Sequence, residues 1–514
     1  MHTQFFLAQY LYPEYDRHSL TLKKGPSHMH HTYNSPLSTR YASSEMNALF
    51  SPQHRHHQWR LIWVTLAKAQ RALGLNITQE QIDELETHIN HIDFERAEEY
   101  EAKFRHDVMA HIHAYGDQCP LARPIIHLGA TSCLITDNAD ILILRDALNL
   151  TKKKLLRLIK ALSHKAETHK ALPCLSWTHF QSGQPSTVGK RLSLYLQDFM
   201  IDLDDLDHRL RNLKLLGTKG ATGTQASFLD LFDGDDEKVQ ALERLFATDL
   251  DFEDVYPISG QTYTRKLDMQ VMDVLCGIAT SAHKIATDIR LLAHKKEWEE
   301  PFKKNQVGSS AMPYKRNPMQ SERVCSLARY VMSLEENPKY TAATQWLERT
   351  LDDSANRRLC LPEAFLGVDS ILLLLINIVE GLQIYPRVIE RNLREDLPFL
   401  ATERILMASV QLGADRQEVH ESLRLHCMEV SRGIKEEGLE NDLLDKLAND
   451  RVIPLSREDL EGLMDAKAFV GRSEKQVEEF LEDCVGAVLE DDNEKGKACG
   501  TLEKEEEVEM AIRV

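Results

Sequence analysis

The sequence predicts an all-α protein built around long helices packed in a bundle. Apolar residues recur in alternating steps of four and three from Leu192 to Leu213, the heptad spacing of long helices packed nearly parallel. A second helical stretch of similar periodicity runs from Val271 to Leu292. A third, residues 361–382, is apolar on nearly all sides, as expected of a helix buried centrally or at a subunit interface. Alternating strand patterns are scarce, so we expect little sheet.

The chain divides into three helical domains flanked by two extensions. Its 514 residues suffice for about three domains of ordinary size. The last thirty residues carry nine acidic and four basic side chains, a composition typical of a solvated, disordered tail. We predict a mobile leader at 1–37, an N-terminal helical domain at 38–131, the central long-helix bundle at 132–384, a C-terminal helical domain at 385–488 and the acidic tail at 489–514.

The composition is that of a globular protein from a reducing compartment. Hydrophobic residues make up 42% of the chain and charged residues 28%. The longest nearly apolar run, residues 371–379, is far shorter than the ~20 residues that cross a bilayer. The N-terminus lacks the basic start of a signal peptide, and the nine cysteines are scattered without a CxxC pair. We therefore expect a cytoplasmic protein with no membrane partner.

Charge indicates the kind of ligand. The 62 basic and 80 acidic residues give a net charge of −18, which argues against a nucleic-acid partner. One segment departs from this balance, because residues 301–323 carry five basic side chains against Glu322 alone. A concentrated cationic segment in an acidic protein indicates a small anionic ligand.

The same segment is the strongest candidate for chemistry. Residues 308–318 (GSSAMPYKRNP) begin with small flexible residues and contain two prolines and a cationic pair. Ser321 is predicted to be the N-cap of the following helix. Adjacent serines, cations and a helix N-terminus together predict an oxyanion- or carboxylate-binding site with a hydroxyl inside it. The alternative interpretation is a solvated linker.

Histidines mark two further segments. His179 lies in a polar turn, residues 177–185, just before the heptad helix, and the sequence favours a structural and a catalytic role about equally. Residues 105–113 contain three histidines, but their spacing is no standard zinc ligand set, so we expect no metal.

Two hydroxyl-bearing segments complete the set of candidates. Residues 127–132 (HLGATS) contain the hydroxyl-bearing start of a helix. Farther along, Arg349, Ser354 and Arg358 recur at roughly helical spacing. These three side chains either grip a phosphate or belong to a salt-bridged surface helix.

Taken together, these segments resemble the fumarase/aspartase superfamily and, within it, the adenylosuccinate lyases of the eukaryotic type. The resemblance extends from about residue 38 to about residue 488. The loop pattern GSSxMPxKxNP is shared across the superfamily, whereas Tyr314, Arg316 and residues 321–323 (SER) are similar to the adenylosuccinate branch. The eight motifs, in chain order, are STRYAS (38–43), RHDVMAH (105–111), HLGATS (127–132), THFQ (178–181), GTQASF (223–228), GQTYTRK (260–266), GSSAMPYKRNP (308–318) with SER, and RTLDDSANRR (349–358).

The resemblance implies a role for each matching residue. Ser309 is the implied general base and His179 the implied general acid. Lys315 and Asn317 lie on the mobile catalytic loop, about residues 303–318, and are expected to serve the substrate carboxylates. No cofactor or metal is implied. The residues implied to hold the nucleotide and succinyl groups are Arg40, Tyr41, Arg105, His106, Asp107, Thr131, Ser132, Gln261, Arg323, Arg349, Ser354 and Arg358.

The implied reaction is β-elimination of fumarate from adenylosuccinate, giving AMP, and from the succinylaminoimidazole-carboxamide ribotide of purine nucleotide biosynthesis, giving the aminoimidazole-carboxamide ribotide. The family is homotetrameric, so the long helices are expected to form the tetramer core, with active sites shared between subunits. Two alternatives stay open: a lyase for another fumarate adduct, and a catalytically silent structural protein on the same fold.

One departure from the family pattern lies beside the implied general acid. Ser182 and Gly183 stand where the family usually has Pro-Ala after the THFQ motif. We expect this change to loosen the turn that holds His179.

Overall fold

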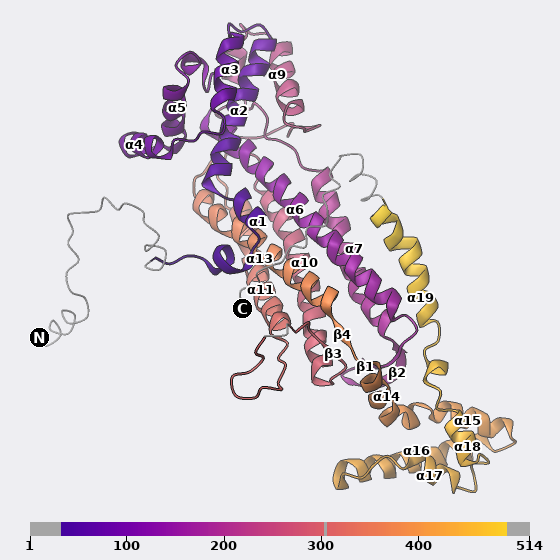
Figure 1. The fold of residues 1–514 in the computed structure, drawn as a ribbon. Coiled ribbons are helices and arrows are strands. Elements are labelled where there is room, and N and C mark those ends of the chain that lie inside the picture. The colour runs from indigo at the N-terminus through magenta and orange to yellow at the C-terminus, as the bar shows by residue number, and fades with distance from the viewer. Residues whose placement is uncertain (1–31, 303–305, 491–514) are drawn as a thin grey trace, which may run out of the picture.

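The computed structural model describes residues 32–302 and 306–490 and has the all-α architecture that the sequence predicts. Most of the predicted leader and tail, residues 1–31 and 491–514, lies outside the described residues. Long helices run along the middle of the molecule, with shorter helices gathered at both ends (Figure 1). In the described part of the chain the strands form two short two-stranded sheets.

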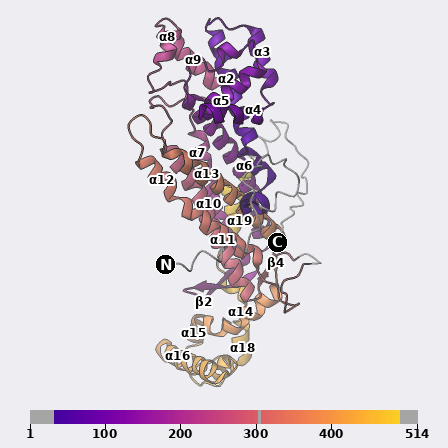
Figure 2. The same ribbon diagram turned by 90° about the vertical axis from the view of Figure 1, so that its left-hand side faces the viewer.

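Short helices gather around α2 at one end of the molecule (Figure 1). Ser51 caps α2 by accepting a hydrogen bond from the His54 amide at 3.2 Å, and Pro52 occupies the first helical position, where its missing N–H costs nothing. Two helices from later in the chain, α8 and α9, join this end (Figures 1 and 2). The elements at this end are α2 (Pro52–Ala72), α3 (Gln79–His88), α4 (Phe94–Phe104), α5 (Asp107–Gln118), η3 (Arg123–Ile125), α8 (Ala226–Leu231) and α9 (Asp236–Thr248). Before them, η2 (Leu37–Tyr41) packs on α13, and α1 (Ser44–Leu49) packs on α6 and α13 of the bundle.

Five long helices form the central bundle. Helix α6 packs against α7 and α13, and α10 packs against α7, α11 and α13. The view turned by 90° shows the same helices side by side along the long axis (Figure 2). The bundle consists of α6 (Ser132–Thr168), α7 (Val188–Arg211), α10 (Lys266–His294), α11 (Met319–Leu334) and α13 (Asp353–Gly381), with the short α12 (Glu336–Ala343) between the last two.

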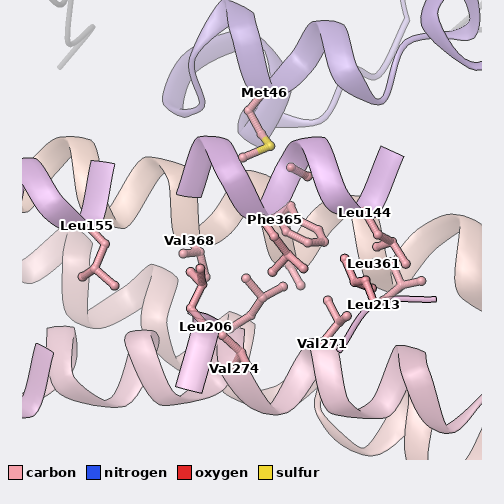
Figure 3. Close-up of a cluster of buried hydrophobic side chains, with 14 of the residues drawn as sticks. Met46, Leu144, Leu155, Leu206, Leu213, Val271, Val274, Leu361, Phe365 and Val368 are labelled. Atoms are coloured by element: carbon pink, nitrogen blue, oxygen red, sulfur yellow. The ribbon is translucent and has the colours of Figure 1, made fainter. Parts of the chain in front are cut away.

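The predicted apolar seams are buried where these helices meet. Leu192, Leu196, Phe199, Leu203 and Leu206 of α7 are all at most 3% exposed. Figure 3 shows part of the resulting core, in which apolar side chains of several bundle helices interdigitate. The heptad prediction for this helix is therefore confirmed.

Helix α13 is the most apolar element of the structure. By length and composition alone it is the one described helix that qualifies as a membrane span. However, 78% of its most apolar window is buried inside the protein. Residues such as Phe365, Ile371 and Leu375 are fully buried, so α13 is the core helix of the bundle.

Two antiparallel strand pairs, one of them a hairpin, lie at the end of the bundle opposite α5 (Figure 1). The first consists of β1 (Pro173–Thr178) and β2 (Gln181–Thr187), between α6 and α7. The second pairs β3 (Trp298–Glu299) with β4 (Gln383–Ile384), which ties the chain before the predicted catalytic loop to the end of α13.

The C-terminal helices have a small core of their own. Ile405, Val419, Leu423, Leu447 and Leu460 belong to a cluster separate from the main one. Helix α19 then returns to α7, and Val477 joins the core of the bundle. The elements are α14 (Pro386–Leu400), α15 (Thr402–Gln411), α16 (Arg416–Arg432), η4 (Gly433–Glu437), α17 (Leu443–Ala448), α18 (Arg457–Gly462), η5 (Ala466–Phe469), α19 (Ser473–Phe480) and η6 (Leu481–Gly486).

The three histidines of residues 105–113 lie in three different environments. The His111 ring stacks on His56, with ring centroids 3.8 Å apart. The His113 ring packs against Phe104, with centroids 4.8 Å apart. His106 is the N-cap of α5. Among residues 32–302 and 306–490, no three His, Cys, Asp or Glu side chains are grouped to hold a metal ion.

We expect acid to destabilise the protein through the stacked pair His56 and His111. Burial lowers the pKa of His56 to about 3 and that of His111 to about 4. Because the unfolded chain takes up protons near pH 6.5 and the folded chain does not, stability is complete above pH 6.5 and falls as the pH drops toward 4. Each ring is expected to cost about 2 kcal/mol between pH 7 and pH 5.

Urea unfolding at the two pH values measures this loss. His56→Phe keeps an aromatic ring but removes one titration, so its stability should depend less on pH. His420→Gln, at an exposed position of α16, is the control. An equal loss in His56→Phe and in the unmodified protein would show that this ring is not responsible.

Candidate functional site

The predicted site residues lie in three groups along the molecule. The first group surrounds His106 at the α5 end of the bundle. The second is His179 in the β1–β2 hairpin, at the opposite end (Figure 1). The third is the loop before α11, with Ser309, Lys315 and Asn317, together with Arg40, Tyr41 and Arg323.

The His106 group comes from four segments of the chain. His106 Nε2 and Ser132 Oγ are 3.4 Å apart, which joins the α5 cap to the start of α6. Arg358 of α13 donates to Asp107 at 3.4 Å. We call this set the His106 cluster: Arg105, His106, Asp107, Thr131, Ser132, Gln261, Arg349, Ser354 and Arg358.

Helix ends position the members of the His106 cluster. Arg105 ends α4 in the left-handed conformation, with φ of 54°, so the chain turns sharply before α5. His106 caps α5 by accepting from the Met109 amide at 3.4 Å. Thr131 is the N-cap of α6, and Ser132 is its first residue, as the predicted hydroxyl-bearing helix start requires.

Gln261 and Arg349 lie on two adjoining loops. The backbone N–H of Gln261 donates to the Glu348 carbonyl at 3.1 Å. The Gln261 side chain donates to the Ala221 carbonyl at 3.0 Å and accepts from the Cys133 thiol at 3.4 Å. Arg349 donates to Asp353 at 2.9 Å, and its side chain is 23% exposed. The guanidinium is therefore held by Asp353 and remains partly exposed.

Asp353 carries a full negative charge beneath Arg349. Burial alone would raise the pKa of this carboxyl, but Arg265 and Arg349 together hold it below its ordinary value. Arg265, on the far side of Asp353, is itself 3% exposed and paired. Sequence reasoning did not single out Asp353 or Arg265, although both lie inside motifs that it used; charged residues flanking Gln261 and Arg349 were the available signal.

His179 occupies the tip of a two-residue hairpin turn. Thr178 pairs with Gln181, and the two turn residues His179 and Phe180 have φ of 54° and 57°. Positive φ at both central positions is the geometry of a type I′ turn, which matches the twist of the flanking strands. Both side chains project from the tip, and Phe180 is 57% exposed. His179 is therefore presented outward on a rigid hairpin and is not buried as a core histidine.

Ser182 anchors this hairpin to α14. Its hydroxyl donates to the Asp396 carboxylate at 2.6 Å. Gly183 has no positive φ, and a Cβ there would approach no atom closer than 3.5 Å. The hydrogen bond from Ser182 to Asp396 restrains the hairpin and therefore opposes the loosening expected at Ser182-Gly183.

The loop of Ser309 is closed at its base. The Asn317 amide donates to the Gly308 carbonyl at 2.9 Å, and a Cβ on Gly308 would lie 2.2 Å from the Lys315 carbonyl oxygen. Inside the loop, the backbone amides of Ala311 and Met312 donate to Ser309 Oγ at 3.4 and 3.1 Å. The serine oxygen thus already faces two N–H donors, while the Lys315 side chain is exposed.

The predicted N-cap role of Ser321 is wrong. Helix α11 begins at Met319 after Pro318, so Ser321 lies inside its first turn. The first-turn amides, which have no partner inside the helix, are capped by Glu300, which accepts from the Gln320 and Ser321 nitrogens at 3.0 and 2.5 Å. Proline before a helix has no hydroxyl to offer, so a carboxylate from the preceding strand region replaces it.

Arg323 and Tyr41 bring the N-terminal segment to α11. The Arg323 guanidinium lies 5.5 Å from the centre of the Tyr41 ring, a cation–π distance. Arg40 is exposed beside them. The segment is anchored at Ser43, whose amide donates to Asp369 of α13 at 2.7 Å and whose hydroxyl accepts from Lys154 at 2.8 Å.

Comparison with known proteins identifies the family of the chain. Residues 70–333 match the family model described as lyase, and residues 398–480 match the one described as adenylosuccinate lyase C-terminus. The chain is 50% identical over 461 residues to the adenylosuccinate lyase of Saccharomyces cerevisiae, a match that covers 89% of this chain and 96% of the yeast protein. It belongs to the adenylosuccinate lyase family.

Other relatives within the adenylosuccinate lyase family are more distant. The protein from Schistosoma mansoni is 49% identical, covering 87% of this chain and 94% of its own, and that from Pyrococcus abyssi is 32% identical, covering 87% and 97%. The fold is shared more widely. A 3-carboxy-cis,cis-muconate lactonizing enzyme from Pseudomonas putida superposes with a TM-score of 0.76 at 24% identity, covering 87% of this chain and 98% of its own.

We expect Gly308→Ala to open the base of the Ser309 loop, the predicted catalytic loop, in this adenylosuccinate lyase family member. The added Cβ meets the Lys315 carbonyl at 2.2 Å, so the loop ends must separate. The free energy of unfolding should change little because the loop is mostly exposed, whereas kcat for fumarate release should fall at least tenfold.

Gly462→Ala is the matched control, because a Cβ there meets nothing within 4 Å. Steady-state kinetics and thermal unfolding of both variants are the measurements. A Gly308→Ala enzyme with unchanged kcat would show that the closed base of the loop is dispensable.

Proposed function

We propose that this protein releases fumarate from adenylosuccinate, giving AMP, and from the succinylaminoimidazole-carboxamide ribotide, giving the aminoimidazole-carboxamide ribotide. The observation that carries the proposal is identity of about half over nearly the whole chain to adenylosuccinate lyases, together with the serine loop and the histidine turn described above. A metal or cofactor is not required by the chemistry proposed for these side chains.

Ser309 is the proposed general base. It removes the proton from the carbon next to a carboxylate of the succinyl group, and the electron pair left behind delocalises into that carboxylate. A serine hydroxyl is a weak base, so its deprotonated form needs stabilisation. The amides of Ala311 and Met312 already point at Ser309 Oγ, and Lys315 adds a positive charge on the same loop.

His179 is the proposed general acid. As the electron pair returns, the bond between carbon and the purine-side nitrogen breaks, and the nitrogen needs a proton. An imidazole is suited to donate it near neutral pH. The type I′ turn fixes the backbone of His179 while leaving the ring accessible. Proton removal by Ser309 and proton donation by His179 together leave fumarate and the free amine.

The His106 cluster is the proposed nucleotide site. The substrate carries about four negative charges, counting a phosphate and two carboxylates. Arg349, Ser354 and Arg358 lie on or beside the first two turns of α13 and provide two guanidinium groups and a hydroxyl. Their partially exposed state supports phosphate binding over a purely salt-bridged surface helix.

A homotetramer with shared active sites is the proposed assembly. His179 and the His106 cluster lie at opposite ends of the bundle, and a small substrate spans no such distance (Figure 1). Exposed apolar side chains around α12 support assembly, since Trp346 is 74% and Leu347 97% exposed. Neighbouring copies then bring the three groups together. The eight cysteines in the described residues are free thiols, which supports a cytoplasmic location.

We expect Ser309→Ala and His179→Gln each to lower kcat by about 100- to 10,000-fold while the substrate still binds. Fumarate release from adenylosuccinate, with S-malate and argininosuccinate as control substrates, is the measurement. Release from adenylosuccinate alone supports the proposal. Near-normal turnover by either variant removes that residue from its role, and no release by a folded wild-type protein favours the structural alternative.

Mixing the two inactive variants tests whether sites are shared. If Ser309 and His179 of one site come from different subunits, random hybrids regain wild-type pairs in about a quarter of their sites. We therefore expect activity to return after the two variants are mixed, dissociated and reassembled. Mixed protein that stays inactive, with hybrids demonstrated by differently sized tags, would mean that each site takes both residues from one chain.

A further inference from the structure

A buried chain of ion pairs runs beneath the His106 cluster. Arg265, the residue before α10, lies between two carboxylates: its Nε donates to Asp353 at 2.7 Å and its Nη1 to Asp137 at 3.0 Å. All three side chains are at most 4% exposed. Asp353 then accepts from Arg349 at 2.9 Å through its other oxygen.

The pairs connect the starts of three long helices. Asp137 lies in the second turn of α6, Arg265 precedes α10, and Asp353 is the first residue of α13. Rigid helix ends thus hold every residue of this ion-pair network except Arg349, which lies on the loop before α13. The fixed carboxylate of Asp353 therefore limits the conformations open to Arg349.

The same network of ion pairs also holds the loop of Gln261. The Tyr263 amide donates to Asp137 at 3.1 Å, and the Tyr263 ring lies 4.5 Å from the Arg265 guanidinium. On the other side, Gly260 packs so closely on Glu348 that a Cβ would lie 2.5 Å from the Glu348 carbonyl oxygen. Gln261 is thus clamped between two anchored neighbours.

We infer that Arg265 and Asp353 are positioning residues that hold Arg349 and Gln261 in the geometry that binds the substrate phosphate end. This inference rests on the proposed function, which assigns the nucleotide to the His106 cluster. Arg265 and Asp353 are buried and reach no ligand themselves. They act because a guanidinium already held in place loses less conformational freedom when an anion binds.

A neighbouring ion pair provides a matched control. Asp268 is fully buried and accepts from Arg357 at 2.6 Å and from the Tyr263 hydroxyl at 2.7 Å. It contacts none of the predicted substrate-binding side chains. Asp268→Asn therefore removes a buried charge near the site without releasing Arg349.

The test compares Asp353→Asn, Arg265→Lys and Asp268→Asn in the full-length protein. AMP and adenosine, which differ by the phosphate, are the binding probes in calorimetry. We expect Asp353→Asn and Arg265→Lys to weaken AMP binding about tenfold, to leave adenosine binding unchanged, and to raise KM more than they lower kcat. Asp268→Asn should leave the AMP-to-adenosine ratio as in the unmodified protein.

Coupling to Arg349 is the decisive readout. Because Asp353 is inferred to act through Arg349, Asp353→Asn should cause no further loss of AMP affinity in an Arg349→Ala background. Equal weakening of AMP and adenosine, or additive losses in the double variant, would overturn the inference. If Asp353→Asn does not fold, Arg265→Lys in the same background gives the same comparison. A wild-type protein that binds AMP no more tightly than adenosine would instead contradict the proposed function.

Discussion

The burial of α13 is the constraint on which the rest of the structure depends. A helix that is apolar on nearly all sides is stable in water only when other helices surround it. Helices α6, α10 and α11 pack directly on it. One of its buried carboxylates, Asp369, is paired with Lys154 of α6 and also accepts from the Ser43 amide. The central helix therefore organises the bundle and holds the segment that carries Arg40 and Tyr41.

Long helices separate the segments that carry chemistry. A helix rises about 1.5 Å per residue, so the 37 residues of α6 span roughly 55 Å. The connections at its two ends, one holding Thr131 and the other leading to the His179 hairpin, are therefore far apart in one chain. The bundle gives each group a rigid support. The same helix length is the structural reason for proposing that a complete site takes its groups from more than one copy.

The sequence predicted the helices better than the contacts between their ends. Heptad spacing identified α7 because a helix that buries one face carries apolar residues at regular intervals along the sequence. The cap of α11 was predicted wrongly because its partner, Glu300, lies before the loop, and no local pattern at Ser321 reveals it. The pairing of Arg265 with Asp137 and Asp353 joins residues separated by 128 and 88 positions, which no spacing rule connects. The type I′ turn at His179 likewise depends on strand pairing and not on the usual Asn-Gly signature.

The distribution of positive charge separates supporting arginines from binding arginines. A buried guanidinium is tolerable only when carboxylates neutralise it, as Asp137 and Asp353 do for Arg265. Because carboxylates already neutralise its charge, such a guanidinium attracts a substrate anion little. Arg349 differs, since it shares Asp353 with Arg265 and is 23% exposed. Arg358 is 56% exposed and pairs with the half-exposed Asp107 at 3.4 Å. Arg349 and Arg358 lie at the rim of the buried network and are incompletely neutralised, which is why we propose them as the arginines that attract an anion in a protein of net charge −18.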